Sequence, residues 1–272
     1  MPLPDLAPVV VVLVLLELAA GAFTVTWLGD VSGDAQRGYA GTTALICFAV
    51  LGADLLLMAV LPDPARLLHQ PVDEGLYASM VHWSIALAGG MLMYALFCAI
   101  GTDIARRVVG GAAVLCGVVA LVRMAQTFGS PLLGGYAGAV AFVPAALLAG
   151  SALAGMLLGH WYLIAPDLSF RPLRRAVWLI FLAVGVDAAA IGLGLAVADS
   201  GSRRTVLTDP AFWLLAVGAG VVATGVVNGL TWYFARIRAN QPATAMLYAL
   251  IITALMGVVP AHLLYFITRV PV

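Results

Sequence analysis

The chain has 272 residues, of which 63% are hydrophobic and only 10% are charged, and its formal net charge is zero. Charged residues make up about a quarter of an ordinary soluble domain, so this composition excludes a soluble globular protein and indicates an integral membrane protein. The zero net charge gives no support to nucleic-acid binding, and because all 13 basic residues are arginine, a Schiff-base cofactor such as retinal is excluded.

Apolar stretches recur along the whole sequence, and each is long enough to cross a membrane, which takes about 20 helical residues. The first stretch lacks the basic start of a signal peptide, so we expect it to be a retained span. Short breaks with Pro, Gly or charged residues separate the stretches and leave no soluble domain. We predict an all-α integral membrane protein, a bundle of eight transmembrane helices in one polytopic domain (residues 1–272). The predicted helices cover residues 6–28, 39–61, 77–100, 108–127, 137–164, 175–198, 211–236 and 243–268.

The arginines are distributed unequally between the two sets of loops. Loops after the odd-numbered helices hold eight arginines, whereas the other side holds four. Because cytoplasmic loops are enriched in basic residues, we expect the odd-numbered loops in the cytoplasm, both termini outside, and the inner (plasma) membrane as the location. The eight are Arg37, Arg106, Arg107, Arg171, Arg174, Arg175, Arg236 and Arg238, and the four are Arg66, Arg203, Arg204 and Arg269.

Two segments of the sequence resemble each other. FAVLGAD ends at Asp54 and FLAVGVD ends at Asp187, 133 positions later, with Phe, Gly and Asp in matching places. One interpretation is a duplication of four helices, with parallel halves at 1–134 and 135–272. The alternative is chance similarity, because alanine-rich membrane helices draw on few residue types.

Small residues predict where helices approach closely. Ala146, Gly150 and Ala154 are spaced four apart, as are Gly225 and Gly229. Such spacing places small residues on one helix face and lets two backbones meet. Asn228, next to Gly229, is a candidate for a hydrogen bond between helices.

Histidines at membrane depth suggest a haem site. An ionisable residue in the bilayer costs several kcal/mol unless it faces protein or water, so each is a candidate functional residue. His82 and His262 lie at similar predicted depths below the outer surface, and Arg123 belongs to the same layer. Two imidazoles could ligate the iron of haem b, with the arginine on a propionate. The alternative is neutral histidines bonded to a carbonyl or to Asp54.

A second candidate site lies at the inner end of the fifth predicted helix. His160 is followed by two aromatic residues of the kind found at membrane interfaces, and then by a loop rich in proline and arginine. This pattern suits an amphiphilic ligand such as a quinone, a lipid headgroup or the propionates of a haem, whereas ordinary interfacial anchoring explains all of it except His160. The predicted ligand residues are His160, Trp161, Tyr162, Arg171, Arg174 and Arg175.

Carboxylates inside the predicted helices suggest a third possibility. Glu17, Asp54 and Asp187 lie in the middle or outer third of their spans. In a proton- or cation-coupled transporter such groups carry the ion. A structural pair between Asp54 and Arg123 is the alternative.

Three functional hypotheses follow. The first is a membrane redox protein that binds haem b near the outer leaflet and exchanges electrons with quinone or a respiratory partner subunit. The second is a proton- or cation-coupled transporter or permease, and the third is a non-catalytic membrane subunit. The sequence contains no Walker loop and no GxSxG, HExxH or CxxCH motif, so whether the protein is an enzyme is left open.

Overall fold

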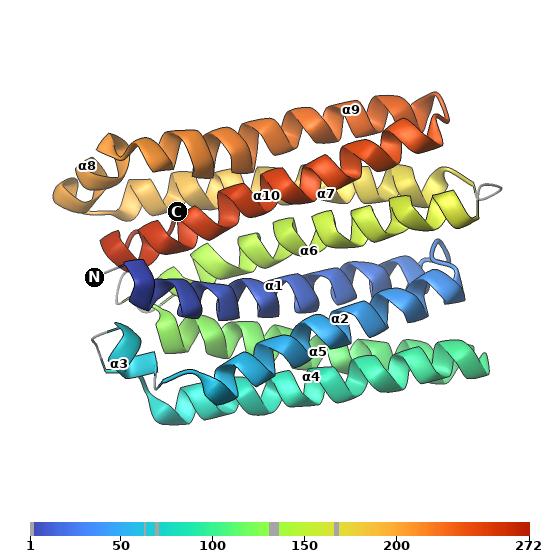
Figure 1. The fold of residues 1–272 in the computed structure, drawn as a ribbon, viewed down its shortest axis with the longest axis horizontal. Coiled ribbons are helices and arrows are strands. Elements are labelled where there is room, and N and C mark those ends of the chain that lie inside the picture. Colours follow the sequence, from blue (N-terminus) through green and yellow to red (C-terminus); the bar gives the residue numbers. More distant parts are fainter. Residues whose placement is uncertain (1–2, 63, 69–70, 131–135, 166–168) are drawn as a thin grey trace.

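The computed structural model describes residues 3–62, 64–68, 71–130, 136–165 and 169–272, and these residues form an all-helical bundle (Figure 1). Eight helices are long and apolar enough to cross a membrane, as predicted. The spans are α1 (Leu3–Val31), α2 (Arg37–Val60), α4 (Glu74–Ile100), α5 (Asp103–Phe128), α6 (Ala137–Ile164), α7 (Arg171–Val197), η2 with α9 (Phe212–Ala223 and Thr224–Arg236) and α10 (Asn240–Thr268). Two short helices, α3 (Pro64–Leu68) and α8 (Ser200–Thr208), lie between spans.

Several helices begin earlier than hydropathy predicts, because polar residues supply their first turns. Asp73 caps α4 by accepting a hydrogen bond from the backbone N–H of Leu76, so α4 begins at Glu74. Helix α5 begins at Asp103, an acidic residue in its first turn, without a side-chain capping bond. Arg106 and Arg107, predicted to lie in a loop, are therefore helical residues.

The two central helices are α1 and α6. In the most apolar part of α1 and of α6, 72% and 67% of the residues are buried, compared with 22% in the corresponding part of α7. Helices α2, α4 and α5 lie on one side of this pair, and α7, α9 and α10 lie on the other (Figure 1). A residue on α1 or α6 is therefore surrounded by protein on most sides, which makes these helices the place to look for a buried polar site.

Glycines bring α1 and α6 into backbone contact. A Cβ atom on Gly150 would lie 2.3 Å from the carbonyl carbon of Gly21, so neither position has room for a side chain. This contact confirms the small-residue face predicted on α6.

The corresponding prediction for Gly225 and Gly229 is wrong. A Cβ on Gly229 would meet nothing within 4 Å, and one on Gly225 would make only an ordinary contact. The close crossing on this side is instead between Gly220 and Gly257, where an added Cβ would come within 2.8 Å of the opposite backbone. Spacing identifies small residues on one helix face but not which face meets a neighbour: Gly225 and Gly229 lie in the α-helix α9, whereas the glycine that approaches α10 closely belongs to the π-helical segment η2.

Both chain ends lie at the same end of the bundle (Figure 1). The opposite end carries the connections after α1, α4, α6 and α9, and with them the larger set of arginines. We call this the arginine-rich end. It provides the frame for the positions of the polar residues.

Candidate functional site

The most deeply buried ionisable pair joins α1 to α10. Glu17 is 0% exposed and His262 is 1% exposed, and the Nε2 atom of His262 lies 2.9 Å from both carboxylate oxygens of Glu17. The edge of the imidazole packs against Phe142 of α6, with ring centroids 5.1 Å apart. A titratable pair is thus enclosed by three helices in largely apolar surroundings.

Asp187 lies close to this pair. It is half-buried on α7 and lines a small cavity together with His262 and with the backbone region around Gly257 of α10. Val272, near the end of the chain, lines the same cavity. The structure therefore brings two of the three predicted carboxylates, Glu17 and Asp187, into the surroundings of one imidazole.

The contact with Glu17 uses one ring nitrogen of His262 and leaves the other without a partner in the described structure. With Nε2–H donating to the carboxylate, Nδ1 of His262 is buried and has no hydrogen-bond partner among the described residues. A proton added at Nδ1 turns a carboxylate beside a neutral imidazole into a neutralised ion pair. The net charge of the pair changes by one while every new charge has a partner in direct contact.

Asp54 is separate from this site. Its carboxylate is 0% exposed, and neither oxygen has a hydrogen-bond partner in the described structure. Its helix, α2, packs against α1 and α4, on the other side of the central pair from α7 (Figure 1). The predicted partner Arg123 instead donates a hydrogen bond to Gln126 at 2.9 Å, so the expected Asp54–Arg123 pair is not formed.

The predicted pair of haem ligands is not formed either. His82 is exposed on α4, which packs against α5 and α2, whereas His262 is buried on α10 and bonded to Glu17. Equal depth was predicted from the rise per residue, but depth does not determine which face a side chain occupies. Within the described residues no group of three or more metal-ligating side chains occurs. Haem binding itself stays a prediction that this geometry does not favour.

The residues of the predicted inner-leaflet site point in three directions. His160 is exposed, with Nδ1 3.0 Å from the hydroxyl of Tyr248 on α10. Trp161 donates from Nε1 to the side chain of Gln36, and Tyr162 is buried and donates to the backbone carbonyl of Ser169. Consecutive helical residues diverge in this way, so these three side chains do not form one site.

The arginines of that prediction gather at a different partner. Arg171 and Arg175 both form ion pairs with Asp34, which follows α1, while Arg174 is exposed between them. Asp34 was not among the predicted residues. The part of the prediction that the structure brings together is therefore a basic cluster beside α1 rather than a site around His160.

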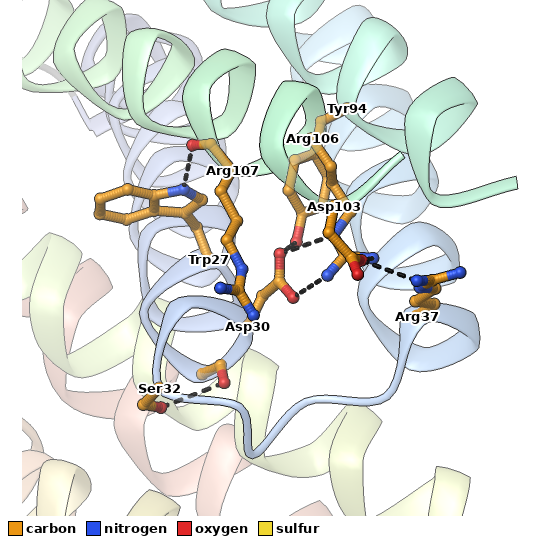
Figure 2. A network of polar contacts seen from close by, with 9 residues as sticks. Trp27, Asp30, Ser32, Arg37, Tyr94, Asp103, Arg106 and Arg107 are labelled. Atoms are coloured by element: carbon orange, nitrogen blue, oxygen red, sulfur yellow. Dashed lines mark hydrogen bonds and ion pairs between the residues drawn. The ribbon is translucent and has the colours of Figure 1, made fainter. Parts of the chain in front are cut away.

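A further polar network at the arginine-rich end was missed from sequence (Figure 2). The Nε and Nη2 atoms of Arg106 donate to the two oxygens of Asp30 at 2.9 and 2.6 Å, and the hydroxyl of Tyr94 donates to the same carboxylate at 2.9 Å. Asp103 extends the network by bonding Arg37 at 2.8 Å and Arg106 at 3.1 Å. The bidentate geometry fixes α1, α4 and α5 to one another.

The sequence carried a weak signal for this network. Asp30 lies two residues beyond the predicted end of the first helix, and Arg106 lies two residues before the predicted start of the fourth. Opposite charges immediately outside two spans at the same membrane surface are candidates for pairing. Trp27 strengthens the same junction by donating from Nε1 to the carbonyl of Arg107 at 2.9 Å.

No family model, no curated protein and no solved structure matches this chain. The side-chain contacts described above therefore carry the functional interpretation by themselves.

Proposed function

We propose that this multi-pass membrane protein is a proton-coupled transporter in which Glu17 and His262 hold the coupling proton. The observation that carries the proposal is the contact of the imidazole Nε2 with both oxygens of a fully buried carboxylate, with Asp187 on the same cavity. The proposal thus develops the second of the three hypotheses from sequence.

The energetic argument starts from the cost of burial. Removing two ions from water costs several kcal/mol each, and well-packed hydrophobic residues often replace a buried ion pair without loss of stability. A pair of this kind is therefore a poor device for stability alone. Ionisable residues within membrane spans are candidates for proton relays by default.

The location of the pair supports the same function. Glu17 belongs to one of the two central helices, and His262 belongs to α10, which packs against both α1 and α6. Substrate and ion sites of many transporters lie where two groups of helices meet near the middle of the membrane. A change in protonation at this junction would alter the attraction between α1 and α10, which is the kind of change that couples a proton to helix movement.

A four-helix repeat is part of this proposal. In the first half α1 packs against α2 and α5, and in the second half α6 packs against α7 and α10. The third and fourth spans of each half also cross closely at small residues. Gly90 of α4 contacts Ala113 of α5 in the first half, and Gly220 of η2 contacts Gly257 of α10 in the second. The suggested boundary between positions 134 and 135 lies outside the described residues.

The orientation is proposed from the arginines. We infer that the arginine-rich end faces the cytoplasm and that the protein lies in the inner (plasma) membrane. Cysteines introduced as Arg107→Cys and Arg204→Cys test this with a membrane-impermeant maleimide, since both positions are exposed and at opposite ends. We expect Arg204→Cys to react in intact cells and Arg107→Cys to react only after permeabilisation. The reverse pattern would invert the orientation.

The decisive experiment detects the proton without needing a substrate. Infrared difference spectra of the purified protein, recorded across its pH range of stability, report the imidazole ring modes of His262 and the carboxylate and carboxyl stretches of Glu17. We expect a reversible pH-dependent change in the imidazole modes that is lost in His262→Asn, together with a shift of the carboxylate band that is lost in Glu17→Gln. Tyr265→Phe is the matched control, because Tyr265 is also buried on α10 and bonds only to backbone groups of residues 128 and 130. Bands of His262 and Glu17 that both stay unchanged throughout would exclude the pair as a proton carrier.

Transport itself is measured in proteoliposomes that contain a pH-sensitive dye. A compound that is a substrate should start proton movement in vesicles with the native protein and not in those with Glu17→Gln. An absorption spectrum of the purified protein with a reduced-state haem band would instead favour the redox hypothesis.

A further inference from the structure

A lateral groove lies between α1, α6 and α7 at the arginine-rich end. Its volume is about 470 Å³, within the size range of ligand sites. Most of the lining is apolar, and Leu28, Trp178 and Leu182 on its rim are 45%, 62% and 59% exposed. Because these are large apolar side chains on membrane-spanning helices, the groove opens toward the hydrocarbon region of the bilayer.

One end of the groove is strongly polar. Asp34 and Arg175 line it, and Arg171 also reaches the carboxylate of Asp34. The Asp34 side chain is only 9% exposed, whereas those of Arg171 and Arg175 are 65% and 45% exposed. Asp34 thus holds two guanidinium groups at the mouth of the groove while leaving much of each one accessible.

Among the described residues the charge at this mouth is not balanced. Two arginines share one carboxylate, and Arg174, which is exposed between them in sequence, adds a further positive charge. Guanidinium groups bind phosphate oxygens through paired hydrogen bonds, and basic residues at the membrane surface attract anionic lipids. The chemistry that complements this end of the groove is therefore a phosphate with a net negative charge.

We propose that the groove binds an anionic phospholipid, with the phosphate at Arg171 and Arg175 and one acyl chain along α7. From Arg175 to Leu182 the groove follows seven residues of helix, about 10 Å, which accommodates the upper part of an acyl chain. A quinone has no charge to balance the arginines, and a zwitterionic lipid adds no net negative charge. The site is independent of the buried pair of Glu17 and His262.

Trp178 is a natural reporter for this site, because it lines the groove and is accessible from it. We would reconstitute the full chain in phosphatidylcholine and add phosphatidylglycerol or phosphatidylcholine with brominated acyl chains, which quench tryptophan fluorescence on contact. Subtracting the signal of Trp178→Phe isolates this residue from the other tryptophans. We expect brominated phosphatidylglycerol to quench Trp178 at several-fold lower mole fraction than brominated phosphatidylcholine.

Variants separate recognition of the headgroup from general lipid contact. Arg171→Gln and Arg175→Gln should each lower the preference for phosphatidylglycerol by about fivefold. Asp34→Asn should raise it, because the competing carboxylate is removed. Replacement of Arg203 and Arg204 by Gln, at the opposite end of the bundle, is the control and should leave it unchanged.

Three results would overturn the proposal. They are equal quenching by the two brominated lipids in the native chain, a preference that survives both arginine substitutions, and displacement of the anionic lipid by a short-chain quinone at equal mole fraction. Since Asp34→Asn and the arginine substitutions are expected to act in opposite directions, a loss of folding in one of them does not reproduce the expected pattern.

Discussion

Replacing Asp30 with asparagine would remove the buried carboxylate that accepts two hydrogen bonds from Arg106. Among the described residues, the guanidinium group would keep only its 3.1 Å contact with the half-exposed Asp103. The side chains of Asp30 and Arg106 are 1% and 4% exposed, and their shortest contact is 2.6 Å. Asparagine has nearly the same shape as aspartate, so the packing of α1 against α5 is retained while the charge is lost. The substitution therefore tests the electrostatic contribution of the pair (Figure 2).

The expected cost is large because the pair is buried. Removing one partner of a buried ion pair costs about 3–5 kcal/mol, which lowers the folding equilibrium constant by roughly 100-fold or more. Adding Arg106→Met to Asp30→Asn removes the buried charge that has lost its main partner and should restore most of the stability, because an apolar replacement needs no counter-ion. The double variant thus separates the cost of an unpaired charge from the loss of a contact.

The assay is unfolding of the purified protein in mixed micelles of increasing denaturing detergent, followed by circular dichroism. Arg37→Gln is the matched control, because Arg37 contacts Asp103 in the same network but both side chains are about half exposed, at 48% and 52%. Solvent screens such a pair, so we expect stability close to that of the native protein. A single Asp30→Asn variant as stable as this control, or a double variant no better than the single one, would refute the reasoning.

Three further predictions use other contacts. Gly150→Ala should destabilise the bundle by about 1–3 kcal/mol or more in the same assay, because the added Cβ would overlap the backbone of Gly21. Gly229→Ala is the control and should be neutral or slightly stabilising, because the space around Gly229 is open. Asn228→Leu should cost about 0.6–1.7 kcal/mol, since it removes the bond from Nδ2 to the carbonyl of Val177, and a native-like midpoint would exclude a role for that bond. In α8, hydrogen bonds, chiefly from the backbone N–H of Ser202, hold the pKa of Asp199 below its ordinary value of 3.8. The Asp199 cap therefore stabilises α8 fully above pH 3.8, and this stabilisation is lost as the pH falls through the lowered pKa. Hydrogen exchange of α8 that stays equally slow in acid would contradict this prediction.

The number and order of the spans could be predicted because a hydropathy profile shows the length of each apolar stretch, and a helix needs a minimum apolar length to cross the bilayer. The hydrogen bond of Asn228 to a neighbouring helix was also predicted, since a polar amide inside a membrane needs a partner. Both predictions depend only on what one segment requires. They need no knowledge of which helix lies beside it.

The pairing of the candidate residues could not be predicted for a related reason. Glu17 and His262 were each identified, but they were assigned to different sites because a sequence gives the depth of a side chain and not its neighbour. The usual aid, a polar face opposite an apolar one, is missing in α1, which is buried on most sides. Asp30 and Arg106 were missed because the helices extend past the apolar stretches that were used to place their ends.

The two buried ion pairs differ in a way that bears on function. Arg106 keeps its charge under all ordinary conditions, so its contact with Asp30 is a permanent connection between α1 and α5. An imidazole can carry one or two ring protons, so under the proposed function the contact of His262 with Glu17 has two electrostatic states. Both pairs attach to α1, one at the arginine-rich end and the other in the interior. Under the proposed function, a helix fixed at one end by a permanent pair and held in its middle by the contact of Glu17 with His262 would respond to protonation at the second contact, and for that reason the search for a coupling site should begin at Glu17.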